Sequence, residues 1–233
     1  MVLAMRITPF LLVMAAAAPA TAAERRYSLT DFDRIRVEGP YEVRIVSGGP
    51  SGATATGDAS GLDHVSVDVE GRTLRIRPNR NAWGASKNSV PGPVRVDVTT
   101  RSVRSATVIG SGRLAIDRAS GLRVDLAVSG SGSLSVAAAD ADRLEVGLLG
   151  AGTIALAGKA KTFRATLQGS GGLDAAALQA PDVELSLDTS GSVAVGAERT
   201  AKVRALGTGD TQILGTATCT VTGTAAAYVK CGR

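Results

Sequence analysis

His64 is the only imidazole that the chain offers for general acid–base chemistry. A nucleophile–histidine triad requires a serine or cysteine within hydrogen-bond reach of that ring, and most serines lie far from His64 in the sequence. We therefore interpret His64 as a surface residue beside Asp63. A zinc site requires three or four clustered His, Cys or carboxylate ligands, and the sequence shows no such cluster. It predicts no cofactor and no metal site.

Paired carboxylates are the other candidates for catalysis. Glycoside hydrolysis requires two carboxyl groups at a defined separation across a cleft. Asp140 and Asp142 are the closest pair, in a segment that reads as a solvated turn. The other candidates are spaced one or more repeats apart: Asp117, Asp125, Asp174 and Asp188. Sugar clefts also tend to offer aromatic platforms, and the repeats contain only Phe163. The sequence favours a non-enzyme; the alternative is a β-helix that binds or cleaves anionic polysaccharide.

Two cysteines, Cys219 and Cys231, lie close together near the end of the chain. In an exported protein an isolated pair most simply forms one disulfide. We expect this bond to be structural and to hold the last part of the fold together.

Two groups of cations could bind a ligand. Arg77, Arg80, Trp83 and Lys87 fall in a long polar segment that reads as an exposed loop, with the tryptophan either at a recognition site or folded down as a lid. Five further arginines recur at roughly one repeat: Arg113, Arg123, Arg143, Arg164 and Arg204. If these align, they form a basic ladder suited to anionic envelope polymers. The alternative is that they keep the strand faces soluble.

The beginning of the chain resembles an export signal. Arg6 is followed by an apolar run from Phe10 to Ala18, then by Pro19 and a small-x-small pattern at 20–22. That run is shorter than the roughly 20 residues that span a bilayer. We predict a cleaved signal peptide over 1–22 and an exported protein, in the periplasm, at the outer surface or secreted, with no later membrane span. The net charge of +5 is too small to indicate nucleic-acid binding.

A glycine repeat decides the expected fold. Gly-x-Gly tripeptides or degraded copies begin at 110, 130, 150, 169, 189 and 207. Their glycines are Gly110, Gly112, Gly130, Gly132, Gly150, Gly152, Gly169, Gly171, Gly191, Gly207 and Gly209. Each interval contains a short strand, a polar turn and a longer alternating strand such as Leu122, Val124, Leu126 and Val128. Glycine permits both a sharp bend and a close approach of stacked backbones.

This period predicts an all-β fold, a right-handed parallel β-helix or solenoid with coils of about 20 residues. Aromatic residues make up only 3% of the chain, which fits a narrow core of Val, Leu, Ile and Ala. We expect one solenoid domain over 23–233. It comprises N-terminal coils and a cap over 27–100, regular repeats over 101–215 and a disulfide-tied cap over 216–233.

The pattern Phe32-x-x-Ile35-x-Val37-x-Gly39, with the strand residues that follow it and the Gly-Ser-Gly series, resembles a bacterial family. That family is described as "putative autotransporter adhesin, head GIN" domain. The resemblance implies a right-handed parallel β-helix and a location in the cell envelope or outside the cell. We expect a non-enzymatic structural or binding module, adhesin-like, whose partner is an anionic envelope polysaccharide or another surface molecule.

Overall fold

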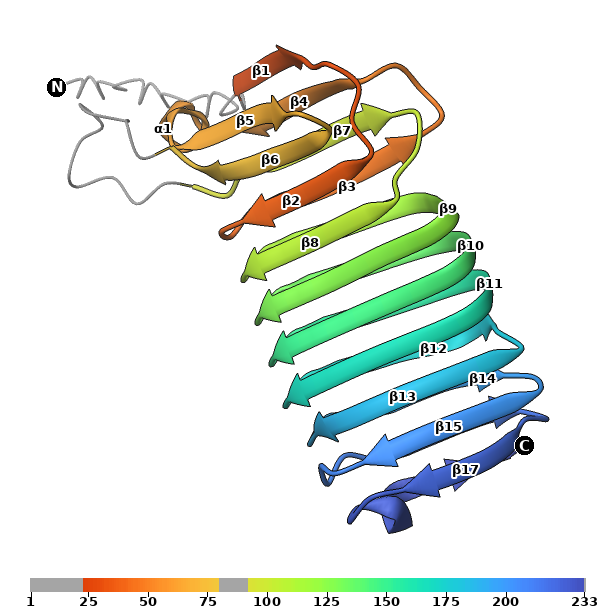
Figure 1. The fold of residues 1–233 in the computed structure, drawn as a ribbon. Coiled ribbons are helices and arrows are strands. Elements are labelled where there is room, and N and C mark those ends of the chain that lie inside the picture. The colour runs from red at the N-terminus through yellow and green to blue at the C-terminus, as the bar shows by residue number, and fades with distance from the viewer. Residues whose placement is uncertain (1–22, 80–91, 233) are drawn as a thin grey trace, which may run out of the picture.

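The computed structural model describes residues 23–79 and 92–232. They form a right-handed parallel β-solenoid, so the fold predicted from the glycine period is confirmed (Figure 1). Each coil has one strand segment on the front of Figure 1 and one on the back. Three strands wrap around a bend and contribute to both faces: β9 (Arg113–Gly130), β10 (Ser133–Gly150) and β11 (Thr153–Gly169).

The remaining strands belong to one face each. The front face contains β5 (Val65–Glu70), β6 (Thr73–Pro78), β2 (Arg34–Glu38), β8 (Ser105–Gly110), β13 (Asp182–Thr189), β15 (Thr200–Ala205) and β17 (Thr218–Thr222). The back face contains β1 (Ala23–Ser28), β4 (Gly52–Gly57), β7 (Arg95–Thr100), β3 (Glu42–Ser47), β12 (Gly172–Gln179), β14 (Val193–Ala197), β16 (Thr211–Gly215) and β18 (Val229–Cys231).

The first strands depart from the coil pattern. β1 pairs with β4, β4 with β7, and β5 with β6, all antiparallel. These pairs extend both faces above the first parallel rungs, where β2 lies between β6 and β8 and β3 lies between β7 and β9. A short helix, α1 (Ala59–Asp63), connects β4 to β5, and its N-terminus is capped by the Asp58 side chain. The sequence shows this region to be rich in strands but not that its outer strands pair antiparallel.

Inward side chains of equal position stack from coil to coil and make the core. Leu114, Leu134, Ile154 and Leu173 form one such row, all at most 2% exposed. Phe163 is fully buried in another row, so it offers no platform to a sugar. The alternating strand predicted to begin at Leu122 begins later, so Leu122 does not share the inward direction of Val124, Leu126 and Val128. Leu122 lies in the bend of β9 and is 81% exposed, and the alternation begins two residues later.

The two glycines of each corner have different structural roles. The first glycine of the corner takes a positive φ in the regular copies, for example +117° at Gly130. The second glycine lies against the coil above: a Cβ on Gly132 would lie 2.5 Å from the carbonyl oxygen of Gly112 and 2.9 Å from Val108 Cγ1. Backbone hydrogen bonds join the same corners, from Gly132 N to Gly110 O at 2.8 Å and from Ser133 N to Gly112 O at 2.9 Å.

The corner contact gives the first prediction. Gly132→Ala should lower the free energy of unfolding by about 1–3 kcal/mol, because the added methyl group has no space against the stacked backbone. Ser131→Ala, at the exposed middle position of the same corner, is the matched control and should change stability little. Denaturant unfolding measures both, and equal stability of the two variants would contradict the role assigned to the second glycine.

Asp33 joins three segments at the top of the regular coils. Asp33 is 4% exposed, and its carboxylate accepts a hydrogen bond from Arg72 Nη2 at 3.0 Å, while Arg104 Nη2 lies 2.6 Å away. Arg72 is in the β5–β6 turn and Arg104 precedes β8, so the ion pairs hold the antiparallel strands to the first parallel rungs. Burial alone would raise the pKa of Asp33. The hydrogen bond from Arg72 and the charges of Arg104, Arg72 and Arg34 outweigh it, so the pKa lies below its usual value of 3.8.

A lowered pKa makes this contribution sensitive to acid. The stabilisation is complete above pH 3.8 and is lost as the pH falls through the lowered pKa of the folded state. Asp33→Asn should therefore cost about 1.5–3 kcal/mol at neutral pH, and the difference from the wild type should shrink in acid. Urea unfolding at pH 7 and pH 3 measures this. A difference that does not change with pH would show that the charge of Asp33 contributes nothing.

The predicted disulfide between Cys219 and Cys231 is present. Both cysteines occupy inward positions, Cys219 on β17 beneath Ala201 and Cys231 on β18 beneath Ile213. Cys219 is half-buried and Cys231 is exposed, so the bond connects the two faces at the outer side of the last described coil.

Loss of this bond should weaken the end of the solenoid. The Cys219→Ser/Cys231→Ser double variant should lose about 2–3 kcal/mol of unfolding free energy, because the bond closes a short loop. Thermal melts with and without reductant check this: reductant should lower the melting temperature of the wild type and leave the variant unchanged. A wild type insensitive to full reduction would refute the structural role.

Candidate functional site

The arginines expected to form a ladder do not align. Arg123 and Arg143 are neighbours in one row of the front face. Arg164 belongs to the next row, between Glu145 and Glu184. Arg113 lies on the back face, opposite Glu42, and Arg204 lies in a third row beside Ser186. The condition for a continuous basic ladder is therefore not met, and the alternative, that these arginines keep the strand faces soluble, agrees better with their scattered rows.

The front face carries mixed charges that pair with one another. Arg123 contacts Asp125 at 2.8 Å and Glu145 at 2.7 Å, and Arg164 contacts Glu184 at 3.0 Å. The hydrogen bond to Asp125, with the nearby charges, raises the pKa of Arg123. Cations and anions that neutralise each other between coils hold the coils together and give little attraction to a polyanion.

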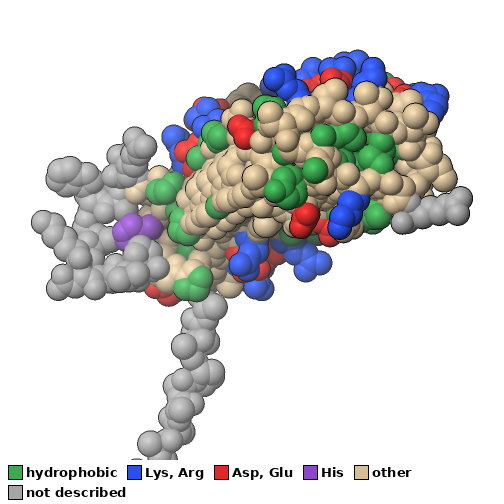
Figure 2. All heavy atoms as spheres, turned by 90° about the horizontal axis from the view of Figure 1, so that it is seen from below, with side chains coloured by type: hydrophobic (Ala, Val, Ile, Leu, Met, Phe, Trp, Pro, Cys, Tyr) green, Lys and Arg blue, Asp and Glu red, His purple; other side chains and the backbone are tan. Residues whose placement is uncertain are grey.

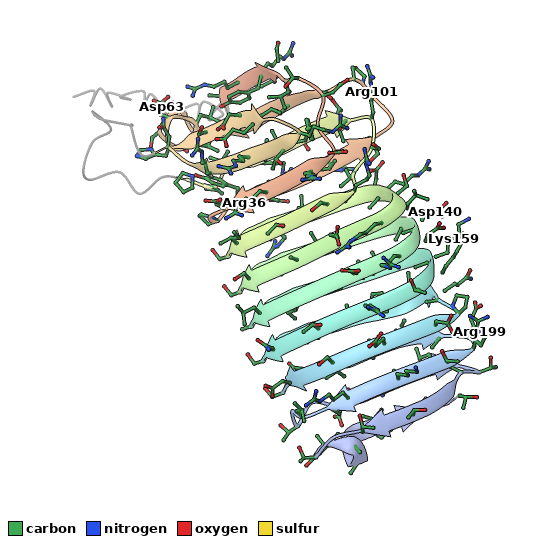
Figure 3. All side chains as sticks on the ribbon, viewed as in Figure 1. Arg36, Asp63, Arg101, Asp140, Lys159 and Arg199 are labelled. Carbon is green, nitrogen blue, oxygen red and sulfur yellow. A yellow bond between two sulfur atoms is a disulfide. The ribbon has the colours of Figure 1, made fainter. Side chains whose placement is uncertain are left out.

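The bends at the other side of the coils are also ion-paired. Asp140 and Lys159 project together from neighbouring coils, 3.5 Å apart, with Arg199 on a bend further down (Figure 3). Asp142 pairs with Lys161 at 2.8 Å. Hydrogen bonds from Arg199 and Thr200 hold the pKa of Asp182 below its usual value. Asp140 and Asp142 are thus partners of lysines in adjacent coils and do not face each other across a cleft.

The other catalytic candidates are dispersed. Asp125 and Asp188 lie on the front face and Asp117 and Asp174 on the back. Asp117 and Asp174 both line one hollow but are three rungs apart, about 14 Å at the usual strand spacing. That exceeds the separation used by either class of glycosidase. The polysaccharide-cleaving alternative therefore finds no support in the described residues.

His64 closes the end of α1. Its Nδ1 lies 2.7 Å from the carbonyl oxygen of Ser60, and its own carbonyl accepts a hydrogen bond from Tyr41 Oη at 3.1 Å. Among the described residues, the hydrogen-bond partner of the ring is therefore a backbone carbonyl and not a hydroxyl or thiol. In the part of the chain that the structure describes, no group of three or more His, Cys, Asp or Glu side chains is placed to hold a metal ion.

Only one residue of the predicted loop site can be placed. Arg77, at the end of β6, pairs with Asp68 at 3.5 Å and Glu70 at 3.6 Å, and it lines a hollow beside Glu38 and Pro78. Arg80, Trp83 and Lys87 lie outside the described residues.

The back face has a feature that the sequence reading missed. Outward positions of five neighbouring strands form one row in register: Arg44, Ala115, Ser135, Ala155 and Asp174. We call this row and the hollow over it the back-face trough. Because three consecutive side chains of the row are small, the surface is hollowed there, with a volume of about 700 Å³ and a mostly apolar lining.

A second row of small side chains borders the trough and lines the same hollow. Ala137 and Ala157 lie beside Ser135 and Ala155 and line the same hollow, with Asp117 at the upper end. Ser47 N donates to both oxygens of Asp117, at 2.9 and 3.0 Å, so a backbone N–H group fixes the orientation of this carboxylate. The trough spans four strand spacings, about 19 Å.

The ends of the trough differ in charge. Arg44 is exposed at the upper end, and its guanidinium forms no ion pair or hydrogen bond with another described residue. Asp97, its register neighbour on β7, is the nearest acidic side chain in the row. Asp174 at the lower end accepts a hydrogen bond from Ala176 N at 3.2 Å. The trough thus offers one available cation, a small-residue apolar floor and a carboxylate at the far end.

A sequence signal for the trough does exist. Ala115, Ser135 and Ala155 all lie five residues after the first glycine of their repeat. Outward positions that stay small in successive coils predict a smooth strip on that face, whereas most of the recurring arginines lie on the opposite face.

These features define a parallel β-solenoid with a chemically distinct exposed face on each side. The described residues contain no helix long and apolar enough to traverse a lipid bilayer. The chain belongs to the family described as "Putative auto-transporter adhesin, head GIN domain", whose model matches residues 31–217. The family resemblance expected from the sequence is therefore confirmed.

Solved structures show the same fold at low sequence identity. A putative adhesin from Bacteroides fragilis has a TM-score of 0.77 at 18% identity, over 91% of this chain and 97% of its own. A putative lipid binding protein from Parabacteroides distasonis has a TM-score of 0.70 at 20% identity, over 92% and 97%. A putative adhesin from Parabacteroides merdae has a TM-score of 0.68 at 19% identity, over 92% and 96%. No curated protein matches the sequence significantly.

Proposed function

We propose that this chain is an exported, non-enzymatic, adhesin-like binding module that holds an anionic amphiphile along the back-face trough. The observation that carries the proposal is the pairing of one available cation, Arg44, with a floor of small, mostly apolar side chains. An acyl chain can lie on such a floor, since each methylene removed from water contributes up to about 0.8 kcal/mol. Its anionic head group can then meet Arg44.

Charge distinguishes this ligand from a polyanion. Asp117 and Asp174 would repel a polymer with a negative charge on every unit, and on the front face Arg123 and Arg164 already have acidic partners. A ligand with one anionic head and a neutral body avoids both carboxylates. The trough also contains no aromatic side chain on which a sugar ring could stack.

Export is the second part of the proposal. A disulfide in the last coil fits an oxidising compartment, and membership of a family described as a putative auto-transporter adhesin supports export. The signal peptide expected over 1–22 lies outside the described residues. One structural relative is described as a putative lipid binding protein, which names the same ligand chemistry.

Binding of a fluorescent fatty-acid analogue by the purified protein tests the function. Arg44→Gln should weaken binding about tenfold, a loss of roughly 1.4 kcal/mol for one charge-assisted contact. Ala155→Phe should abolish binding, because the ring fills the middle of the floor. Thr166→Phe adds the same ring to an exposed front-face position of the same coil and should bind like the wild type.

Two outcomes would contradict the proposal: a wild type that does not bind the probe, or Ala155→Phe and Thr166→Phe variants that bind it equally. Vesicles of anionic and of zwitterionic lipid provide the second measurement. The protein should be retained by the anionic vesicles, and Arg44→Gln should reduce that retention.

A further inference from the structure

The last described coil has unpaired strand edges. β17 pairs with β15 on one side only, and β18 pairs with β16 on one side only. Within the described residues no strand lies against their other sides. Alternate backbone N–H and C=O groups of β17 therefore point away from the sheet. These hydrogen-bond donors and acceptors are satisfied best by pairing with another strand.

The interior of this coil is incomplete as well. Cys219 and Val221 on β17, with Val229 on β18 and Ala217 before β17, occupy core-facing positions but are only partly buried. The equivalent residues one coil higher, Ala201 and Val203, are at most 2% exposed. Figure 2, which views the molecule from below, shows hydrophobic side chains gathered over this end, with charged side chains along both flanks.

The outer strands at the opposite end differ in charge. β1 carries Glu24, Arg25 and Arg26, and β5 carries Asp68 and Glu70. Charged side chains on an edge strand discourage pairing with another chain. β17 reads Thr-Cys-Thr-Val-Thr, with no charge, no proline and no irregularity in its pairing. Of the outer strands that the structure describes at the two ends, β17 is the one without a charged side chain, since β18 contains Lys230.

We propose that the edge of β17 is an interface with the same edge of a second copy of this chain, related by a two-fold axis. A two-fold axis across this end makes the paired strands antiparallel. It sets the outward residues Thr218, Thr220 and Thr222 against the same uncharged row, and threonine pairs across strands are favourable. The edge of β17 offers no counter-charge to a charged strand of another protein. An equally uncharged edge is the better match, and a second copy of this chain supplies one.

The rest of the molecule fits a closed dimer. Pairing covers the half-buried Val221 of both copies, while the charged outer strands β1 and β5 face away and do not extend the assembly. The disulfide fixes β17 relative to β18 before association, so less conformational entropy is lost when the edges meet. This interface lies at the end of the solenoid and does not depend on the proposed ligand of the back-face trough.

Sedimentation velocity of the purified protein without ligand, from low micromolar to several hundred micromolar, tests the interface. The wild type should form a dimer of twice the chain mass. Thr220→Lys should raise the dimer dissociation constant at least tenfold, because it places like charges opposite each other across the paired edges. Ser186→Lys, exposed on β13 of the same face, is the matched control and should dimerise like the wild type.

A wild type that stays monomeric over the whole range would overturn the proposal. So would a folded Thr220→Lys variant, with its disulfide intact, that dimerises as well as the control. Hydrogen exchange locates the contact: the amides of β17 should exchange more slowly at high protein concentration. If the amides of β1 or β5 were protected instead as the protein concentration rises, the dimer contact would lie at the opposite end of the solenoid, and the proposed interface would be refuted.

Discussion

The close contact between glycine backbones at successive corners is the constraint on which the rest of this structure depends. Gly112 lies against Gly39, Gly132 against Gly112, and Gly152 against Gly132, each with space for a hydrogen atom but not for a methyl group. Backbone hydrogen bonds across the corners then fix coil upon coil in one register. Because the corners superimpose, every other position of the repeat superimposes too. The core can therefore be built from aliphatic side chains with few aromatic residues.

The same register extends to the surface. A position that repeats along the sequence becomes a row along the solenoid, so each face is a set of rows one strand spacing apart. On the front, alternating signs in the row of Glu145, Arg164 and Glu184 stabilise neighbouring coils. On the back, small residues at one repeat position leave the trough. Surface function in this fold is therefore decided by which residue types stay constant at one position from coil to coil.

The sequence predicted the period, the parallel stacking and the disulfide, because glycine spacing and cysteine count express them directly. It did not predict the arginine rows, and the reason is local. Arg123 and Arg143 lie 13 residues after the first glycine of their repeats, whereas Arg164 lies 14 after Gly150. The third coil is one residue shorter in its bend, where the pairing of β10 with β11 shifts register between Val136 and Ala139. That deletion moves Arg164 into the row of Asp125 and Glu145.

The two ends of a solenoid pose the same physical problem, since each exposes backbone groups and core-facing side chains, and this chain treats them differently. The upper end adds antiparallel strands with charged side chains and a buried carboxylate, Asp33, that holds them to the coils. The lower end keeps the parallel pattern to its last strands and connects its two faces through the Cys219–Cys231 bond. This bond connects the two faces of the last described coil, but it satisfies no backbone group on the edge. Both ends therefore finish in strands that are paired on one side only. The outer strands of the upper end carry charged side chains that discourage pairing with another chain, whereas β17 at the lower end carries none.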